Sequence, residues 1–311
     1  MKNTFIIALL WCFVSSTAQT KETNANQTPK DTLKEKSILL KEVIVTGNVK
    51  TDPNLTIVKS DFSEKVVQPK NSGELFSDIN GFSLIKRGNY ALDPSFRANQ
   101  YEQLNVQYDG GTRAFHACPN RMDPITTLVN PEEISKIEII KGPFSVRYGN
   151  TFAGVINMVS QYGNPSEKAF VGSFSSGYES NSNSLVTILQ LSSNWKKFDI
   201  VGDLSYRNYG NYKDGNQNEI PSSFNSKGYG LKMGYQFSEN QRLQVNVRQN
   251  FGRDVLHAGL PMDTDEDNSS IASLDYSSKS NAVFYKGVTA KVYYSYVDHI
   301  MSNYSRPSFV N

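Results

Sequence analysis

Beyond Pro165 the chain alternates apolar or aromatic residues with polar ones at a period of two, in segments of about ten residues. Turns rich in Asn, Ser, Gly and Lys separate these segments. The segments run over 169–178, 185–193, 198–209, 229–237, 243–251 and 288–301. A period of two places successive side chains on opposite faces of a strand. The pattern therefore predicts antiparallel β-strands, which a transmembrane barrel and a soluble sandwich would share.

The segment 288–301 has two unlike faces. One face is apolar and aromatic and suits lipid, and it holds Val288, Ala290, Val292, Tyr294 and Tyr296. The other face suits the lumen of a barrel, and it holds Lys291, Tyr293, Ser295, Val297, His299 and Met301. His299 and Met301 therefore project together from a strand end, as a pair of metal-capable side chains. The alternative interpretation is an ordinary lumen histidine near an aromatic belt.

Residues from about 48 to 160 follow a different pattern, typical of a compact domain of mixed α and β structure. Short apolar strands are predicted at 104–108, 136–140 and 154–159, alternating with loops or helical stretches. Asn71 and Asn130 each begin a predicted helix, and Pro131 suits the first helical turn. The predicted class of this region is α+β.

The first 47 residues contain two segments that precede this domain. Residues 1–18 have the layout of a secretory signal peptide, a short basic start, an apolar run and a small-residue cleavage site after Ala18. A lipoprotein site at Cys12 is disfavoured because bulky Trp11 precedes it. Residues 19–47 are polar and flexible up to a β-prone stretch, Val43, Ile44, Val45 and Thr46. That stretch can add to the sheet edge of a partner, or it is the first strand of the next domain.

Charge and motif content exclude several classes of function. The net charge of +2 over 311 residues is too balanced for a nucleic-acid partner. The chain has no Gly-x-Ser-x-Gly, His-Glu-x-x-His or P-loop pattern, and its three histidines leave little room for a catalytic triad. We therefore expect no enzymatic activity.

Cys118 and Met122 form the first candidate metal-binding pair. Loss of the signal peptide removes Cys12, so Cys118 would be an unpaired cysteine in an oxidising compartment. Pro119 favours a helical turn that would place Met122 above Cys118 on one face. Thiolate and thioether are soft ligands that suit Cu(I). The alternative is a buried cysteine beside a gap-filling methionine.

The run from Ile137 to Gly149, Ile-Glu-Ile-Ile-Lys-Gly-Pro-Phe-Ser-Val-Arg-Tyr-Gly, resembles the signature of the plug domain of TonB-dependent outer-membrane receptors. The runs 154–160, 95–97 and 106–110 fit the same plug pattern, although Ala98 stands where the family usually has glycine. The resemblance implies a plug over 48–162, the N-terminal part of a β-barrel over 163–311, and a TonB box at Val43–Thr46. It also implies a bacterial outer-membrane location, with the N-terminal segment in the periplasm.

The two metal-capable pairs together resemble the plug-plus-barrel motif of copper-associated receptors in this family. By that resemblance Cys118, Met122, His299 and Met301 converge on one copper ion, as Cu(I), which is the substrate and not a catalytic cofactor. His116, and His257 with Met262 in the loop 256–267, are the alternative ligands.

Receptors of this kind close a barrel of twenty-two strands, and the resemblance therefore implies that this chain carries an incomplete barrel. The roughly 150 residues after the plug suffice for about six or seven strands. We therefore expect the N-terminal part of a longer receptor that takes up copper or a copper complex, energised by TonB and its inner-membrane partners. The alternatives are a receptor for a siderophore, haem or other organic ligand, and a binding protein that keeps the architecture without transport.

Overall fold

The computed structural model describes residues 54–59, 67–144, 146–161 and 170–306. The predicted signal peptide and TonB box lie outside these residues, and so does the predicted boundary between plug and barrel at residue 162. The described residues from 54 onward form one compact unit.

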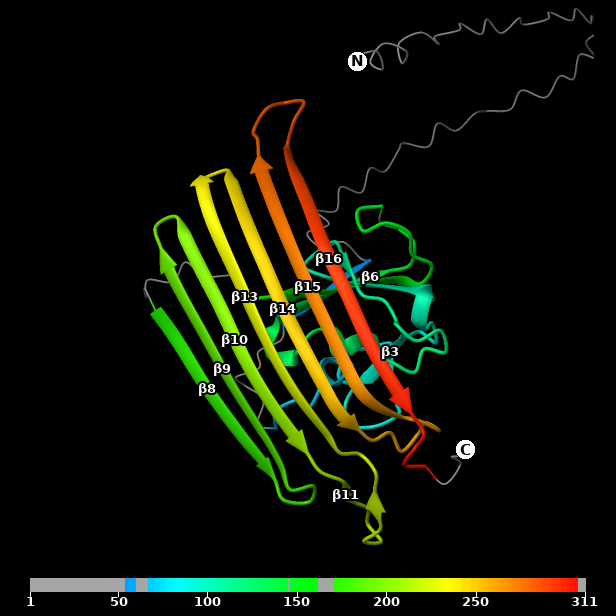
Figure 1. Ribbon diagram of the computed structural model, residues 1–311. Helices are drawn as coiled ribbons and strands as arrows, with labels where there is room; N and C mark the ends of the chain where they lie inside the picture. The colour runs from blue at the N-terminus through cyan, green and yellow to red at the C-terminus, as the bar shows by residue number, and fades with distance from the viewer. Residues whose placement is uncertain (1–53, 60–66, 145, 162–169, 307–311) are drawn as a thin grey trace, which may run out of the picture. The chain divides into compact units, whose positions relative to one another are not determined.

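The largest element is a seven-stranded antiparallel sheet in which each strand pairs with its neighbours along the chain (Figure 1). Its strands are β8 (Phe170–Glu179), β9 (Ser184–Trp195), β10 (Phe198–Tyr209), β13 (Phe224–Ser238), β14 (Gln241–Val255), β15 (Asp263–Lys279) and β16 (Gly287–Ser302). A short hairpin of β11 (Tyr212–Lys213) and β12 (Glu219–Ile220) lies in the connection between β10 and β13. The period-two segments are confirmed as strands of one up-and-down sheet.

Strand β15 was not predicted, and the expected loop over 256–267 is wrong in its second half. The true connection ends at Met262, and Asp263 already pairs with Ser302 of β16. The strand opens with Asp-Thr-Asp-Glu-Asp, a composition that is depleted in strands. The polar side chain of Asp267 is accommodated because one face of β15 meets the preceding domain, where the Tyr90 hydroxyl donates to Asp267.

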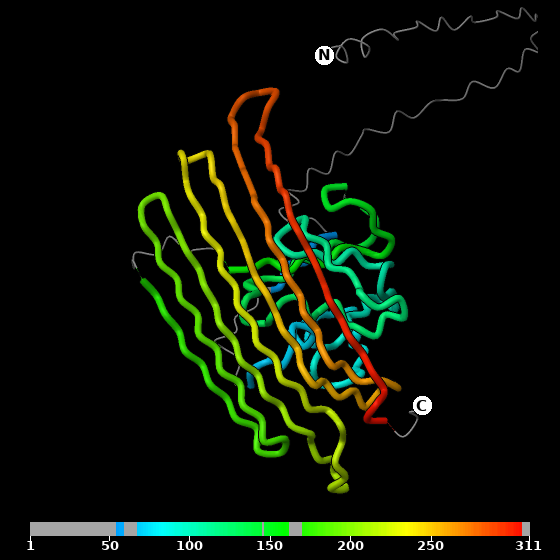
Figure 2. The backbone as a smooth tube through the Cα atoms, viewed as in Figure 1, coloured from blue at the N-terminus to red at the C-terminus, as the bar shows by residue number. Residues whose placement is uncertain are grey.

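The residues before β8 contain two further sheets, a five-stranded mixed sheet and a two-stranded hairpin. Figure 2 traces the backbone of this region beside the long strands. The mixed sheet has the order β1-β6-β7-β4-β5, and only β4 and β7 run parallel. Its strands are β1 (Leu55–Lys59), β4 (Leu104–Tyr108), β5 (Thr112–Arg113), β6 (Ile134–Lys141) and β7 (Gly154–Ser160). The hairpin pairs β2 (Phe82–Lys86) with β3 (Leu92–Phe96). We call this region, from β1 to β7, the plug-side domain.

Helical structure is shorter than predicted, since the described residues contain only single 3₁₀ turns. These turns are η2 (Ser72–Phe76), η3 (Tyr101–Gln103), η4 (Ile125–Leu128) and η5 (Pro131–Glu133). The predicted caps are confirmed, because the Glu74 N–H donates to the Asn71 side chain at 3.3 Å and Asn130 precedes Pro131 at the start of η5. Among the described residues, no helix has the length and apolar character needed to cross a membrane.

The hydrophobic core of the plug-side domain extends to the inner face of the large sheet. Phe76, Tyr108 and Met158 are almost fully buried in it, Ile271 of β15 belongs to the same cluster, and Val297 of β16 packs against it. On the opposite face of β16, Val292 is 72% exposed. The two predicted faces of this strand are therefore confirmed, and the face with His299 is the one turned toward the plug-side domain.

Candidate metal site between the plug-side domain and the sheet

The loop that carries Cys118 and Met122 is a β-turn, and the predicted helical turn from Pro119 is wrong. The Arg121 N–H donates to the Cys118 carbonyl at 2.9 Å, which closes a four-residue turn with Pro119 at its first central position. Arg121 has a φ of +52°, outside the right-handed helical region, so the helix cannot continue. Met122 is therefore not placed one helical turn above Cys118.

Asp123 fixes the shape of this loop by accepting three contacts. Its carboxylate accepts the Cys118 N–H at 2.9 Å and the Ala117 N–H, and its carbonyl lies 2.6 Å from Nδ1 of His116. Because a carboxylate holds both backbone donors, the Cys118 backbone has little freedom. The free thiol of Cys118 is half-buried. It lies, with His116, along a pocket of about 400 Å³.

His299 lies on the inner face of β16, and neither of its ring nitrogens is hydrogen-bonded within the described residues. Its side chain is 4% exposed, and Nδ1 lies 3.4 Å from a carboxylate oxygen of Asp267 on β15. The other oxygen of Asp267 accepts a hydrogen bond of 2.9 Å from the Tyr90 hydroxyl. Within the described residues neither ring nitrogen has a hydrogen-bond partner, and the approach of Nδ1 to Asp267 is an ion-pair contact. Histidines that bind metals usually have a carboxylate on the side of the non-ligating nitrogen, and Asp267 lies on the Nδ1 side of His299.

The loop of Cys118 and the end of β16 approach the same region. The Arg87 guanidinium donates to the Arg121 carbonyl in the loop, and the Arg87 carbonyl accepts the Gly259 N–H at 2.8 Å in the connection that leads into β15. Met301 lies on the same inner face as His299, opposite Thr264 of β15, and is half-buried like Met122. Among the described residues no three His, Cys, Asp or Glu side chains already form a metal cage. The proposed set of Cys118, Met122, His299 and Met301 contains only two residues of these four types, so this absence does not test it. The convergence of the four side chains stays a prediction.

The alternative ligands are partly engaged elsewhere. His257 is 2% exposed. Its backbone N–H donates to the Asp263 carboxylate at 2.9 Å, and its ring Nε2 lies 3.0 Å from the Thr264 hydroxyl. Burial in the connection between β14 and β15 lowers the pKa of His257 to about 4, so its ring is neutral at pH 7. A Cβ added at Gly88 would lie 3.1 Å from Nδ1 of His257, so the ring also covers the plug-side backbone. Met262 precedes β15 and is half-buried.

Two plug-side residues near this site were not predicted. Asp93 of β3 is 2% exposed, and burial raises its pKa to about 6 against the opposing effect of the Arg87 guanidinium at 3.3 Å. Tyr90, which donates to Asp267, precedes β3 in the connection between β2 and β3. Their only sequence signal is a run of turn and polar residues after a short strand, which does not reveal a partner 177 positions away.

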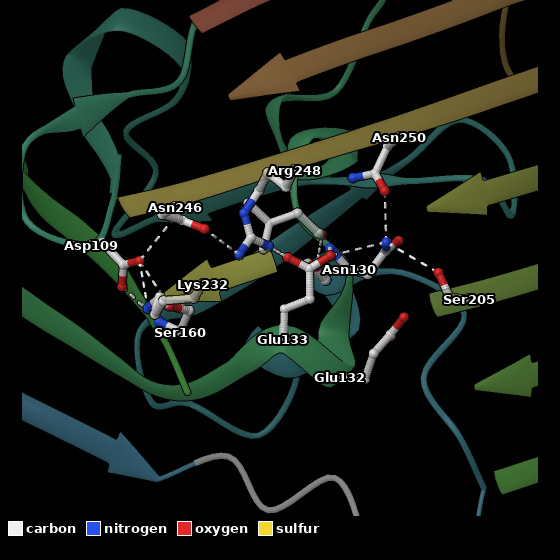
Figure 3. A network of polar contacts seen from close by, with 12 residues as sticks. Asp109, Asn130, Glu132, Glu133, Ser160, Ser205, Lys232, Asn246, Arg248 and Asn250 are labelled. Carbon is white, nitrogen blue, oxygen red and sulfur yellow. Dashed lines mark hydrogen bonds and ion pairs between the residues drawn. The ribbon is translucent and has the colours of Figure 1, made fainter. Parts of the chain in front are cut away.

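Buried polar contacts hold the plug-side domain against the sheet (Figure 3). Glu133 pairs with Arg248 of β14, and Lys232 of β13 binds Asp109 at 3.0 Å and the Ser160 hydroxyl. Asn130 donates to Asn250 at 2.6 Å. A further pair, Glu132 with Arg207 of β10, is closed by hydrogen bonds of 2.6 and 3.2 Å.

Comparisons with known proteins agree with this architecture. Residues 48–155 match the family model of the TonB-dependent Receptor Plug Domain. Over 253 residues the chain is 25% identical to "TonB-dependent heme receptor A" of Haemophilus influenzae, which covers 78% of this chain and 32% of that protein. The chain thus spans about a third of the length of the curated relatives it matches.

Solved structures with the same fold carry different ligands in their names. "Copper transporter OprC" superposes with a TM-score of 0.72 at 25% identity, covering 81% of this chain and 38% of that one. The hemophore receptor HasR of Serratia marcescens superposes with a TM-score of 0.67 at 19% identity, covering 79% of this chain and 38% of that one. The plug-side domain is therefore a TonB-dependent receptor plug, and the large sheet has the fold of part of the receptor barrel.

Proposed function

We propose that this chain, a TonB-dependent receptor by its plug domain and its fold, serves copper uptake. The ion would bind between plug and barrel to Cys118 and Met122 on one side and to His299 and Met301 on the other. The observation that carries the proposal is the unpartnered Nε2 of His299, buried beside the Asp267 carboxylate that lies 3.4 Å from Nδ1. A buried nitrogen without a partner costs free energy, and a metal ion would supply the missing partner.

The donor types favour copper over harder metals. A thiolate, two thioethers and one imidazole form a soft set, which suits Cu(I) and disfavours magnesium, calcium or manganese. Since Cys118 is the only cysteine in the described residues and is free, its thiol is available as a ligand. The likeness to a protein named as a copper transporter supports the same choice.

Haem or another organic metal complex is the alternative, because the curated relatives carry haem in their names. A haem iron also takes imidazole as an axial ligand, so His299 alone does not separate the two ligands. Cys118 and Met122 do separate them, because a haem or siderophore receptor has no need of both sulfur atoms.

In the proposed mechanism the receptor acts by movement and not by covalent chemistry. TonB, energised at the inner membrane, would pull the segment Val43–Thr46, which lies outside the described residues. The plug must then part from the barrel wall, where buried pairs such as Glu132 with Arg207 join them. The copper ion, bare or chelated, would be released toward the periplasm from a receptor seated in outer-membrane lipid.

Copper accumulation in cells that express the full-length receptor tests this function. We expect deletion of Val43–Thr46, or the substitution Cys118→Ala, to abolish receptor-dependent copper uptake while the protein still reaches the outer membrane. Loss of haem uptake in place of copper uptake would favour the haem alternative. Copper binding that persists with no uptake, and that is unchanged by the deletion, would indicate a binding protein without transport.

A further inference from the structure

Arg87, in the connection between β2 and β3, lies where the loop of Cys118 meets the rest of the plug. Its guanidinium donates to the carbonyl of Arg121 through one nitrogen and to the Tyr101 hydroxyl through the other, at 2.9 Å. Arg121 closes the β-turn that begins at Cys118. The Arg87 side chain therefore binds the residue that sits between the two proposed sulfur ligands.

The same guanidinium forms an ion pair with a buried carboxylate. It lies 3.3 Å from Asp93, whose side chain is 3% exposed, and the Arg87 side chain is itself 11% exposed. It also stacks over the Tyr101 ring, at 5.9 Å from the ring centroid. Five donors in a planar fork allow arginine to serve several acceptors at once, which lysine cannot do. Two hydrogen-bond acceptors and one ion-pair partner, from different segments, therefore fix the orientation of this side chain.

The backbone of Arg87 contacts the sheet side of the site. Its carbonyl accepts the N–H of Gly259 at 2.8 Å, in the connection between β14 and β15. A Cβ added at Gly259 would lie 3.2 Å from the Arg87 Cα and carbonyl oxygen, so glycine permits this close approach. That connection leads directly into β15, the strand that pairs with β16 and supplies Asp267.

We infer that Arg87 is the positioning residue of the proposed site, which sets the loop of Cys118 and Met122 in register with the barrel ligands. The inference rests on the proposed function, since it concerns the same site. Arg87 holds the loop of Cys118 through its side chain and the connection between β14 and β15 through its backbone carbonyl. A shift of the plug away from the connection between β14 and β15 would therefore also move Cys118 and Met122 away from His299 and Met301. Plug movement would in this way be coupled to release of the ion.

The reaction rate of Cys118 with a thiol reagent, in the full-length receptor without metal, tests the positioning role directly. We expect Arg87→Ala to raise this rate about tenfold or more, the factor corresponding to the loss of a hydrogen bond from a charged donor. Arg113→Ala is the matched control, because Arg113 lines the same pocket and its guanidinium stacks on Phe115, 5.4 Å from the ring centroid, with no side-chain hydrogen bond to the Cys118 loop within the described residues. Equal rates in wild type, Arg87→Ala and Arg113→Ala would overturn the inference.

A double variant guards against simple misfolding, because Arg87→Ala alone leaves Asp93 buried without its cation. Arg87→Gln with Asp93→Asn removes both charges and should still release Cys118. X-ray absorption of bound Cu(I) gives a second readout: we expect fewer sulfur neighbours in both Arg87 variants, with the histidine nitrogen retained. Arg87→Lys should restore the sulfur count only in part.

The thiol readout separates this inference from the proposed function. A wild-type receptor that binds no copper would refute the proposed copper site. The reaction rates of Cys118 with the thiol reagent would still show whether Arg87 holds the loop. A receptor that binds copper with an unchanged sulfur count in Arg87→Ala would keep the proposed function and refute the positioning role.

Discussion

Removal of Arg207 should weaken the attachment of the plug far more than removal of the whole ion pair. Arg207 and Glu132 are 2% and 0% exposed at their side chains, and two hydrogen bonds of 2.6 and 3.2 Å join them. Gln190 of β9 adds a bond of 2.8 Å to the Glu132 carbonyl. Arg207→Ala leaves a fully buried carboxylate without its cation, which costs about 3–5 kcal/mol in comparable buried pairs.

The double variant Arg207→Met with Glu132→Met gives the opposite expectation. Both charges disappear, and apolar side chains of similar volume fill the space, so the free energy of plug unfolding should return close to that of wild type. Urea titration of the full-length receptor in detergent, with protease cleavage of the plug as the signal, measures both variants. The reasoning is refuted if the double variant is as unstable as Arg207→Ala, or if Arg207→Ala has the wild-type midpoint.

Two further predictions concern the histidines. Asp267→Asn should weaken copper binding by about 10- to 100-fold, because His299 loses the carboxylate that orients it; competition with a Cu(I) chelator measures this, and unchanged affinity would contradict the role of Asp267. Burial lowers the pKa of His257 to about 4 in the folded chain. Between pH 6.5 and 4 the His257 ring is therefore protonated in the unfolded chain and neutral in the folded chain. Stability should therefore fall between pH 6.5 and 4, by up to about 3 kcal/mol, and His257→Phe should lack that part of the loss in urea midpoints at pH 7 and 4.5.

The strands of the large sheet could be predicted because their pattern is local. In β16 the alternation of side chains is set by the strand itself, so His299 and Met301 were assigned to the inner face correctly. Strand β15 could not be predicted because its polar residues find their partners only through tertiary contacts, as Asp267 does with Tyr90. A strand whose inner face meets another domain has no need of an apolar pattern.

The supporting residues of the site could not be predicted for the same reason. Cys118 stands out as an unpaired cysteine, but Asp123 and Arg87 are ordinary loop residues in the sequence. Their roles depend on which backbone groups the folded loop presents to them. The helical turn expected after Pro119 failed because proline favours the first position of a β-turn as well as that of a helix.

The copper content of the purified full-length receptor, grown with copper, tests the central claim most directly. We expect about one copper ion per receptor in wild type, bound to the soft donor set, and none in the variant Cys118→Ala, Met122→Ala. The variant Arg113→Ala serves as a control that should keep its copper, because Arg113 is not one of the proposed ligands. Copper absent from wild type, or present in equal amount in the Cys118 and Met122 variant, would contradict the proposed site.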